Sequence, residues 1–294
     1  MKNLNGKTAF VTGASAGIGY ALAEALGRAG MRVMLAGVNE KNLDAALARL
    51  RSDGITAERV QCDVASRASV EHAARATTAT FGKVHVVCNN AGVGMGGEFG
   101  TIPESDWEWV IRVNLMGVVH GTEVFAPLVA QHGEGGHIVN TSSIAGLLAS
   151  PGMEPYAATK FAVVAISEGW RVQLAPKGIG VSVLCPGFVR TNIGTGHRNR
   201  PGGPRGNGGG QASVLNQLVE GGMDPRMLAE RVLEGIRDDE LYIVTHPELK
   251  GAVEARFDAI LEAFDRAAQS PALANYEPQD LSALGLPPSA STPK

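Results

Sequence analysis

The stretch from residue 7 to residue 30 constrains the fold most. Lys7 to Val11 is a short, apolar, β-branched run that stops at a glycine-rich turn. Apolar residues then recur at helical spacing until Gly30, so the order is strand, glycine turn and helix, which opens a doubly wound parallel sheet. The glycines of the turn allow backbone N–H groups to approach an anion at the helix N-terminus. The alternative is a tight turn that holds no ligand.

The rest of the chain alternates in the same way. Strands are predicted at 32–36, 58–62, 84–88, 137–141, 181–185 and 241–245, and helices near 43–50, 70–81, 104–132, 157–174, 225–236 and 253–264. The sequence therefore predicts an α/β fold, a single Rossmann domain with a doubly wound parallel sheet, over residues 1–246. Residues 247–294 are expected to form a C-terminal helix followed by a loose tail.

The composition excludes several classes of partner. A net charge of −3 and a pI near 6.2 give no electrostatic reason to expect nucleic acid or an anionic membrane. We see no apolar run that approaches the ~18 residues of a membrane span. The N-terminus runs directly into the first strand, and Cys62, Cys88 and Cys185 are odd in number and widely spaced. We therefore expect a cytoplasmic protein with reduced cysteines and no metal site.

Three reactive side chains are predicted to converge. Tyr156 and Lys160 are four residues apart and would share one helix face, and Ser143 follows the strand predicted at 137–141. A positive charge about 4 Å from a phenol, at an effective dielectric constant of ~20, contributes roughly 4 kcal/mol, or ~3 pK units. Lys160 is therefore expected to lower the pKa of Tyr156 far enough for proton exchange near neutral pH.

Four motifs in one order resemble the short-chain dehydrogenase/reductase family over roughly residues 5 to 246. They are the turn at residues 12–19, the run Asn89-Asn90-Ala91-Gly92, the trio just described, and Pro186-Gly187. The resemblance implies reversible hydride transfer between a nicotinamide cofactor and a secondary alcohol or ketone. Tyr156 would be the acid/base, Lys160 would bind the nicotinamide ribose, and Ser143 would orient the substrate oxygen.

Asn114 completes the catalytic set implied by the resemblance. It lies among apolar neighbours in the helix predicted at 104–132, where an unpaired amide is costly. In the family, an asparagine in this context holds a water that links the lysine to solvent. The alternative is an amide that satisfies a helix kink. The choice of Ser143 over Ser142 also comes from the resemblance, through the spacing to the tyrosine.

The resemblance also implies a set of cofactor contacts from the ends of the predicted strands. They are Gly13, Ser15, Gly17, Ile18, Gly19, Gly37, Val38, Asn39, Asp63, Val64, Asn90, Ala91, Gly92, Tyr156, Lys160, Pro186, Gly187, Val189 and Thr191. Asp63 could also, or only, cap the helix that follows it, since the two roles are not exclusive. Gly37 stands where NAD-dependent members place an aspartate, which favours NADP(H), with any phosphate held by Ser15, Asn39 and Lys41. Val38 supplies no basic residue, so NAD(H) stays open.

The residues expected near the substrate are mainly apolar. Together with Ser143 they are Val93, Met95, Leu147, Leu148, Met153, Phe188, Val189 and Ile193, which favours a bulky hydrophobic or aromatic ketone. The strand at 241–245 and the helix after it are similar to bacterial members that oxidise benzylic alcohols of lignin-derived aryl ethers. Residues 188–222, with a glycine-rich centre at 201–210, are expected to form a mobile substrate lid or a plain disordered insertion.

Two further expectations concern assembly and competing functions. The helices at 104–132 and 157–174 are apolar over wide arcs, which favours a homodimer or homotetramer. One competing function is a non-catalytic, cofactor-binding regulator. Another is a dehydratase or epimerase built on the same fold, which would cause no net cofactor oxidation.

Overall fold

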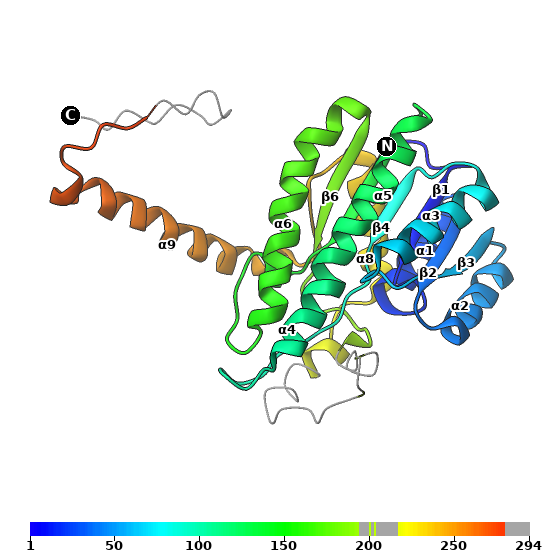
Figure 1. The fold of residues 1–294 in the computed structure, drawn as a ribbon, viewed down its shortest axis with the longest axis horizontal. Helices are drawn as coiled ribbons and strands as arrows, with labels where there is room; N and C mark the ends of the chain where they lie inside the picture. The colour runs from blue at the N-terminus through cyan, green and yellow to red at the C-terminus, as the bar shows by residue number, and fades with distance from the viewer. Residues whose placement is uncertain (194–199, 201–202, 204–216, 280–294) are drawn as a thin grey trace. The chain divides into compact units, whose positions relative to one another are not determined.

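The computed structural model describes residues 1–193, 200, 203 and 217–279, and it divides the chain into two compact units, Met1–Leu249 and Lys250–Lys294. The first unit holds a seven-stranded sheet in the order β3-β2-β1-β4-β5-β6-β7, with every pair parallel (Figure 1). Its strands are β1 (Thr8–Thr12), β2 (Arg32–Gly37), β3 (Ala57–Gln61), β4 (Val86–Asn89), β5 (Gly136–Thr141), β6 (Ile179–Cys185) and β7 (Tyr242–Val244). The predicted doubly wound parallel sheet is confirmed.

Helices cover both faces of the sheet. One face packs against α1 (Gly17–Arg28), α2 (Glu40–Ser52) and α8 (Pro225–Asp238), and the other against α3 (Arg67–Phe81), α5 (Gly117–Gln131) and α6 (Glu154–Leu174) (Figure 1). The short helix α4 (Glu104–Val110) comes before α5 in the chain. Single-turn helices span Ile144–Gly146, Ala175–Lys177, Pro247–Leu249 and Pro271–Leu273. The first core contains Leu22, Leu35 and Leu233, and the second contains Phe10 and Phe125, whose rings stack with centroids 4.3 Å apart.

Short polar side chains set the starts of several helices. Asn39 caps α2 by accepting from Asn42 N, and Asp224 caps α8 by accepting from Arg226 N. The alternative role suggested for Asp63 is wrong, because Ser66 caps α3 and accepts from Ser69 N. The Asp63 carboxylate instead accepts from Ala65 N at 3.0 Å, which shapes the turn after β3.

The long helix expected at 104–132 is present, with an irregular centre. A π-helical segment, Ile111–Met116, separates α4 from α5, and Asn114 lies inside it. By length and composition this run, Glu104–Gln131, is long and apolar enough to cross a membrane, although 44% of its most apolar 18 residues are buried in the protein. Core helices of soluble proteins can be equally long and apolar. Val118, Phe125 and Val129 pack into the cores beside the sheet, so the run is a core helix here.

The second unit contains the predicted C-terminal helix, α9 (Lys250–Ala268). Its apolar residues Phe257, Ile260, Leu261 and Phe264 follow the three-and-four spacing of an amphipathic helix. Lys250 pairs with Glu254, and Glu262 pairs with Arg266, each one turn apart.

Candidate active site

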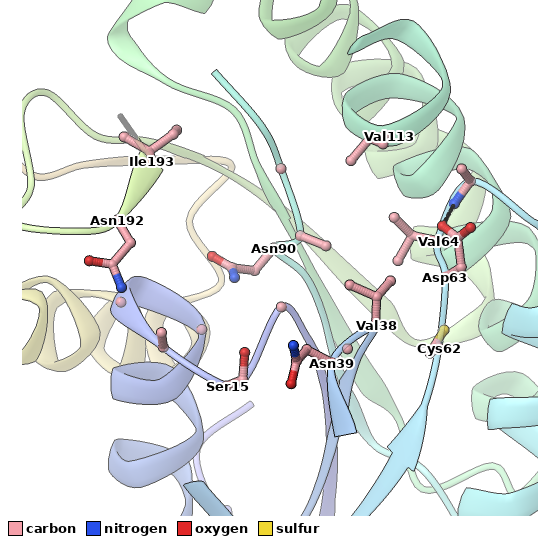
Figure 2. A pocket seen from close by; sticks show the side chains of 18 of the residues that line it. Ser15, Val38, Asn39, Cys62, Asp63, Val64, Asn90, Val113, Asn192 and Ile193 are labelled. Atoms are coloured by element: carbon pink, nitrogen blue, oxygen red, sulfur yellow. Dashed lines mark hydrogen bonds between the residues drawn. The ribbon is translucent and has the colours of Figure 1, made fainter. Parts of the chain in front are cut away.

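A cavity of about 840 Å³ lies at the carboxyl ends of the strands, where the strand order reverses between β1 and β4. Figure 2 shows the turns that surround it: Ser15 follows β1, Val38 and Asn39 follow β2, Asp63 and Val64 follow β3, and Asn90 follows β4. A crevice at the topological switch point is where open α/β sheets bind their ligands.

The turn after β1 is shaped to receive an anion. Gly13 and Gly17 adopt φ angles of +65° and +57°, which side chains other than glycine rarely tolerate. A Cβ on Gly19 would overlap the Gly13 carbonyl oxygen, so α1 begins against the turn itself. Ala16 precedes α1 and offers no side-chain acceptor, and the first turn of α1 has no acidic residue. The first N–H groups of α1 therefore stay available for a pyrophosphate, and the site fits a dinucleotide.

The turns after β1 and β4 are bonded together beneath this cavity. Thr12 Oγ1 accepts from Asn90 N at 2.9 Å and from Ala91 N at 3.0 Å, and it donates to Cys88 O. Asn90 Nδ2 donates to Thr12 O at 3.0 Å. These bonds explain the asparagine motif physically, because they fix the floor of the cavity against the glycine turn.

Ser143, Tyr156 and Lys160 are brought together as predicted. Ser143 follows β5 and is 8% exposed, while Tyr156 and Lys160 lie one turn apart on α6 and are 8% and 3% exposed. Lys160 Nζ donates to Thr141 O at 2.9 Å and lies 5.5 Å from the centroid of the Tyr156 ring. The three side chains thus form one buried group between the end of β5 and the start of α6.

The ionisation of this group differs from the prediction in one respect. Burial raises the pKa of Tyr156 above its usual value, and a hydrogen bond with Ser143 opposes that rise. Burial also lowers the pKa of Lys160 to about 8. The net shift of the Tyr156 pKa is therefore upward, opposite to the direction predicted from its spacing to Lys160, whose ammonium donates to Thr141 O in the structure. Tyr156 therefore keeps its proton at neutral pH.

Asn114 is fully buried in the π-helical segment. Its side chain accepts from Val93 N at 2.8 Å and donates to Val93 O at 2.9 Å, and it lies 3.4 Å from Thr159 Oγ1. A Cβ built on Gly92 would lie 3.4 Å from Asn114 Oδ1 and 3.7 Å from Lys160 Nζ. The amide thus sits at a helix irregularity and also beside the lysine, so the two suggested roles coincide in space.

Most predicted cofactor residues line the cavity. Those that do are Gly13, Ser15, Gly17, Ile18, Gly19, Gly37, Val38, Asn39, Asp63, Val64, Asn90, Ala91, Gly92 and Thr191. Tyr156, Lys160, Pro186, Gly187, Val189 and Lys41 are not among its lining residues. The turn after β6 nevertheless meets the catalytic group, because Ser143 Oγ donates to Pro186 O at 3.4 Å.

The predicted substrate residues are less closely grouped. Ile193 lines the cavity, and Met153 approaches Gly96, which brings the segment after Val93 beside the start of α6. Phe188 is 37% exposed, and Met95 packs beside Trp109. Leu147 packs against the core under α6. Of the predicted lid, residues 188–193, 200, 203 and 217–222 are described, and the other positions lie outside the described part of the chain.

Some residues of the site were not predicted. His246 accepts from Gly187 N at 3.1 Å, and its other ring nitrogen lies 3.1 Å from Phe188 O, so it fixes the turn after β6. The cavity is also lined by Asn42, Trp109, Arg112, Val113, Asn192 and Arg200. The sequence signal for Val113 and Arg112 was their position beside Asn114. His246 had no such signal, since its role depends on a contact across 59 residues of sequence.

His85, His132 and Glu134 form the one cluster in the described residues with the spacing of a metal site. Every ring nitrogen there already has a partner. His85 meets Thr8 N and Glu134, and His132 meets Val84 O and Glu134 N. A bound metal would break these hydrogen bonds, so the cluster is better explained as a structural one.

The parallel sheet, the dinucleotide cavity and the buried serine, tyrosine and lysine define an α/β oxidoreductase that uses a nicotinamide dinucleotide. The sequence agrees with this class: residues 7–201 match the family model described as short chain dehydrogenase. The chain belongs to this short-chain dehydrogenase/reductase family.

Known relatives cover nearly the whole chain. A C alpha-dehydrogenase of Sphingobium sp. is 34% identical over 290 residues, which is 97% of this chain and 95% of the relative. A Burkholderia phymatum short-chain dehydrogenase, solved in complex with NAD, is similar with a TM-score of 0.86 and 39% identity over 90% of this chain and 97% of the other. An alcohol dehydrogenase of Thermococcus sibiricus, complexed with 5-hydroxy-NADP, has a TM-score of 0.68 and 28% identity over 81% and 94%.

Proposed function

We propose that this enzyme transfers hydride reversibly between NAD(H) and a bulky hydrophobic or aromatic secondary alcohol or ketone. The observation that carries the proposal is the buried group of Ser143, Tyr156 and Lys160 beside a dinucleotide cavity. A direct test compares the rates of NADH oxidation with a bulky aryl ketone and with acetone. Faster turnover of the aryl ketone supports the proposal, whereas turnover of neither ketone, or a preference for acetone, argues against it.

The cofactor, when bound, supplies or accepts the hydride. Tyr156 is protonated at neutral pH and donates its phenolic proton to the ketone oxygen during reduction. Ser143 holds that oxygen in place, and Lys160 presents a positive charge that stabilises the tyrosinate left behind. Asn114 fixes the Val93 backbone beside Lys160 and supports the return of a proton to the site.

Apolar residues next to the catalytic group support a bulky substrate. Val93 is 6% exposed, and Met153 is the N-cap residue of α6, three positions before Tyr156. Ile193 lines the cavity (Figure 2). Apolar side chains beside the catalytic group gain little from a small polar substrate and more from an aromatic one. The C alpha-dehydrogenase named among the relatives agrees with an alcohol carbon as the reacting centre.

The turn after β2 supports NAD(H) over the NADP(H) that the sequence favoured. Val38 and Asn39 are neutral, and Lys41 is not among the lining residues. The cations in the described lining, Arg112 and Arg200, come from other segments. Arg59 of β3 is already held by Glu40 and Asp44. A 2′-phosphate would therefore meet no cation among the lining residues of this turn, whereas Asn39 Nδ2 can meet a ribose hydroxyl.

Replacing Gly37 with aspartate is expected to exclude NADPH and leave NADH turnover intact. A Cβ at Gly37 meets Leu43 at 3.5 Å, an ordinary contact, so the side chain fits. Its carboxylate would repel a 2′-phosphate by several kcal/mol at a dielectric constant of ~20, or on the order of 10²-fold in kcat/KM. The measurement is kcat/KM for both cofactors with one aryl ketone.

Ser52→Asp, at the exposed end of α2, adds the same charge away from the cavity and serves as the control. The wild type should already prefer NADH. A wild-type preference for NADPH, or an unchanged NADPH rate in Gly37→Asp, would reject this placement of the ribose.

We further propose that the enzyme is a homodimer or homotetramer. On α6, Val172 is 75% exposed, and on the edge strand β7 Tyr242 and Val244 are 44% and 37% exposed. The Tyr242 hydroxyl bonds Glu168 of α6 at 2.6 Å, so these side chains belong to neighbouring elements. Sedimentation should give more than one subunit for the wild type and a smaller species for Val172→Glu. A monomeric wild type contradicts the proposal.

The competing functions have less support. A regulator without catalysis would have no need to keep an ammonium buried beside a tyrosine, since burying the charge costs stability. A dehydratase or epimerase would consume substrate with no net change in the cofactor, which the measurements below distinguish.

A further inference from the structure

Three consecutive residues at the end of β5 meet the catalytic helix. Thr141 O accepts from Lys160 Nζ at 2.9 Å. Ser142 Oγ donates to the backbone carbonyl of Lys160 at 2.8 Å. Ser143 bonds Tyr156. One short stretch of strand end therefore fixes both ends of the catalytic lysine and the tyrosine one turn before it.

The contact made by Ser142 is buried and tightly enclosed. Ser142 is 2% exposed, and its own N–H donates to Leu184 O at 2.8 Å. Gly146 passes over the contact so closely that a Cβ there would overlap Ser142 Oγ and lie 2.7 Å from Lys160 O. Any side chain at position 146 would push the hydroxyl and the helix apart. The glycine thus permits α6 to approach β5 at the lysine.

We propose that Ser142 is a positioning residue that sets the place of Lys160 relative to Tyr156 and Ser143. The inference rests on the proposed function and extends it beyond Asn114, Ser143, Tyr156 and Lys160. A lysine has four rotatable bonds, so its ammonium position depends on where its backbone is anchored. Ser142 holds that backbone to the same strand end that supplies Thr141 O and Ser143.

Ser167 provides a matched control on the same helix. Its hydroxyl is fully buried and donates to the carbonyl of Val163 at 2.7 Å, just as Ser142 donates to that of Lys160. It also accepts from Asn140 Nδ2 at 3.0 Å. Ser167→Ala therefore removes at least as much hydrogen bonding as Ser142→Ala, but it does so away from Lys160. A purely structural role for Ser142 predicts similar effects in the two variants.

The experiment compares kcat for aryl ketone reduction, and the pH profile of kcat/KM, in wild type, Ser142→Ala and Ser167→Ala. We expect kcat to fall about 5- to 10-fold in Ser142→Ala, the effect of one lost hydrogen bond, and less than twofold in Ser167→Ala. The alkaline limb of the profile should move to higher pH in Ser142→Ala alone, because a looser ammonium gains contact with water. The other titratable groups beside Lys160 keep their protons in this range: burial raises the pKa of Tyr156 above its usual value and that of Cys185 to about 12.

Equal kcat and equal pH profiles in the wild type and Ser142→Ala would overturn the inference, as would equal changes in both variants. If Ser142→Ala fails to fold, as judged by thermal melting, Ser142→Cys replaces the hydroxyl with a larger and weaker donor and should show the same trend at smaller size. Failure of the proposed function is recognised separately, since then the wild type itself would not reduce the aryl ketone, or Tyr156→Phe and Lys160→Met would reduce it at the wild-type rate.

Discussion

Replacing Tyr156 with phenylalanine is expected to lower kcat for ketone reduction by roughly three orders of magnitude. The change removes only the phenolic hydroxyl, the proton donor of the buried group. Tyr156 is 8% exposed and does not line the dinucleotide cavity, so cofactor affinity and thermal stability should change little. The measurements are single-turnover reduction rates and NADH binding by fluorescence.

Tyr276→Phe is the control for the loss of a phenol. Tyr276 is 66% exposed and is not among the residues that line the described cavity. Its variant should retain turnover within about twofold, as expected for a surface substitution outside the site. Near-normal turnover in Tyr156→Phe would remove the tyrosine from the mechanism.

Replacing Lys160 with methionine is expected to lower kcat strongly and to stabilise the fold. The side chains have similar length, so packing should persist, but the charge that stabilises tyrosinate is lost, which costs on the order of 10² to 10³ in kcat. The ammonium is 3% exposed, and burial lowers the pKa of Lys160 from 10.5 to about 8. That shift corresponds to about 3 kcal/mol of destabilisation at pH 7.

The sign of this effect follows from proton binding. Below pH 8 the lysine is charged in both states, and the folded state bears the full cost. Between pH 8 and 10.5 the unfolded state holds more protons, so wild-type stability rises with pH. Methionine has no such dependence. Lys160→Met should therefore be more stable than wild type by about 2 kcal/mol at pH 7, after roughly 1 kcal/mol for the unpaired Thr141 carbonyl.

The stability gap between Lys160→Met and wild type should close as the pH approaches 10.5. Denaturant unfolding at pH 7 and pH 10 measures it, with the exposed Lys177→Met as the control. The same lysine predicts that kcat/KM for reduction is level below pH 8 and falls above it, as the ammonium loses its proton. A Lys160→Met variant that is active and less stable than wild type at pH 7 would contradict the burial of a charged lysine.

Local patterns predicted most of the fold, because strands and helices here repeat apolar residues at their own periods. The glycine turn after β1 and the Tyr156–Lys160 spacing are local too, and the structure places them at the cavity and in one buried group. Asn114 was found through its polar character in an apolar helix, although the π-helical segment around it had no sequence signal.

Features that depend on contacts between distant segments were not predictable in this way. The pKa of Tyr156 rises because the phenol is buried, and the Lys160 ammonium donates to Thr141 O; neither feature follows from a spacing of four residues. His246 meets the turn after β6 across the sheet edge. The sequence separated Ser142 from Ser143 only by resemblance, while the structure gives Ser142 a contact of its own.

The measurement that tests the central claim most directly follows the hydride itself. NADH deuterated at C4 is incubated with the enzyme and a bulky aryl ketone, and the alcohol is examined for label at the carbinol carbon. Hydride transfer predicts one equivalent of NAD formed per alcohol, with the deuterium retained on that carbon from one face of the cofactor. Ketone consumption without cofactor oxidation, or an alcohol whose label has been lost to water, would contradict it.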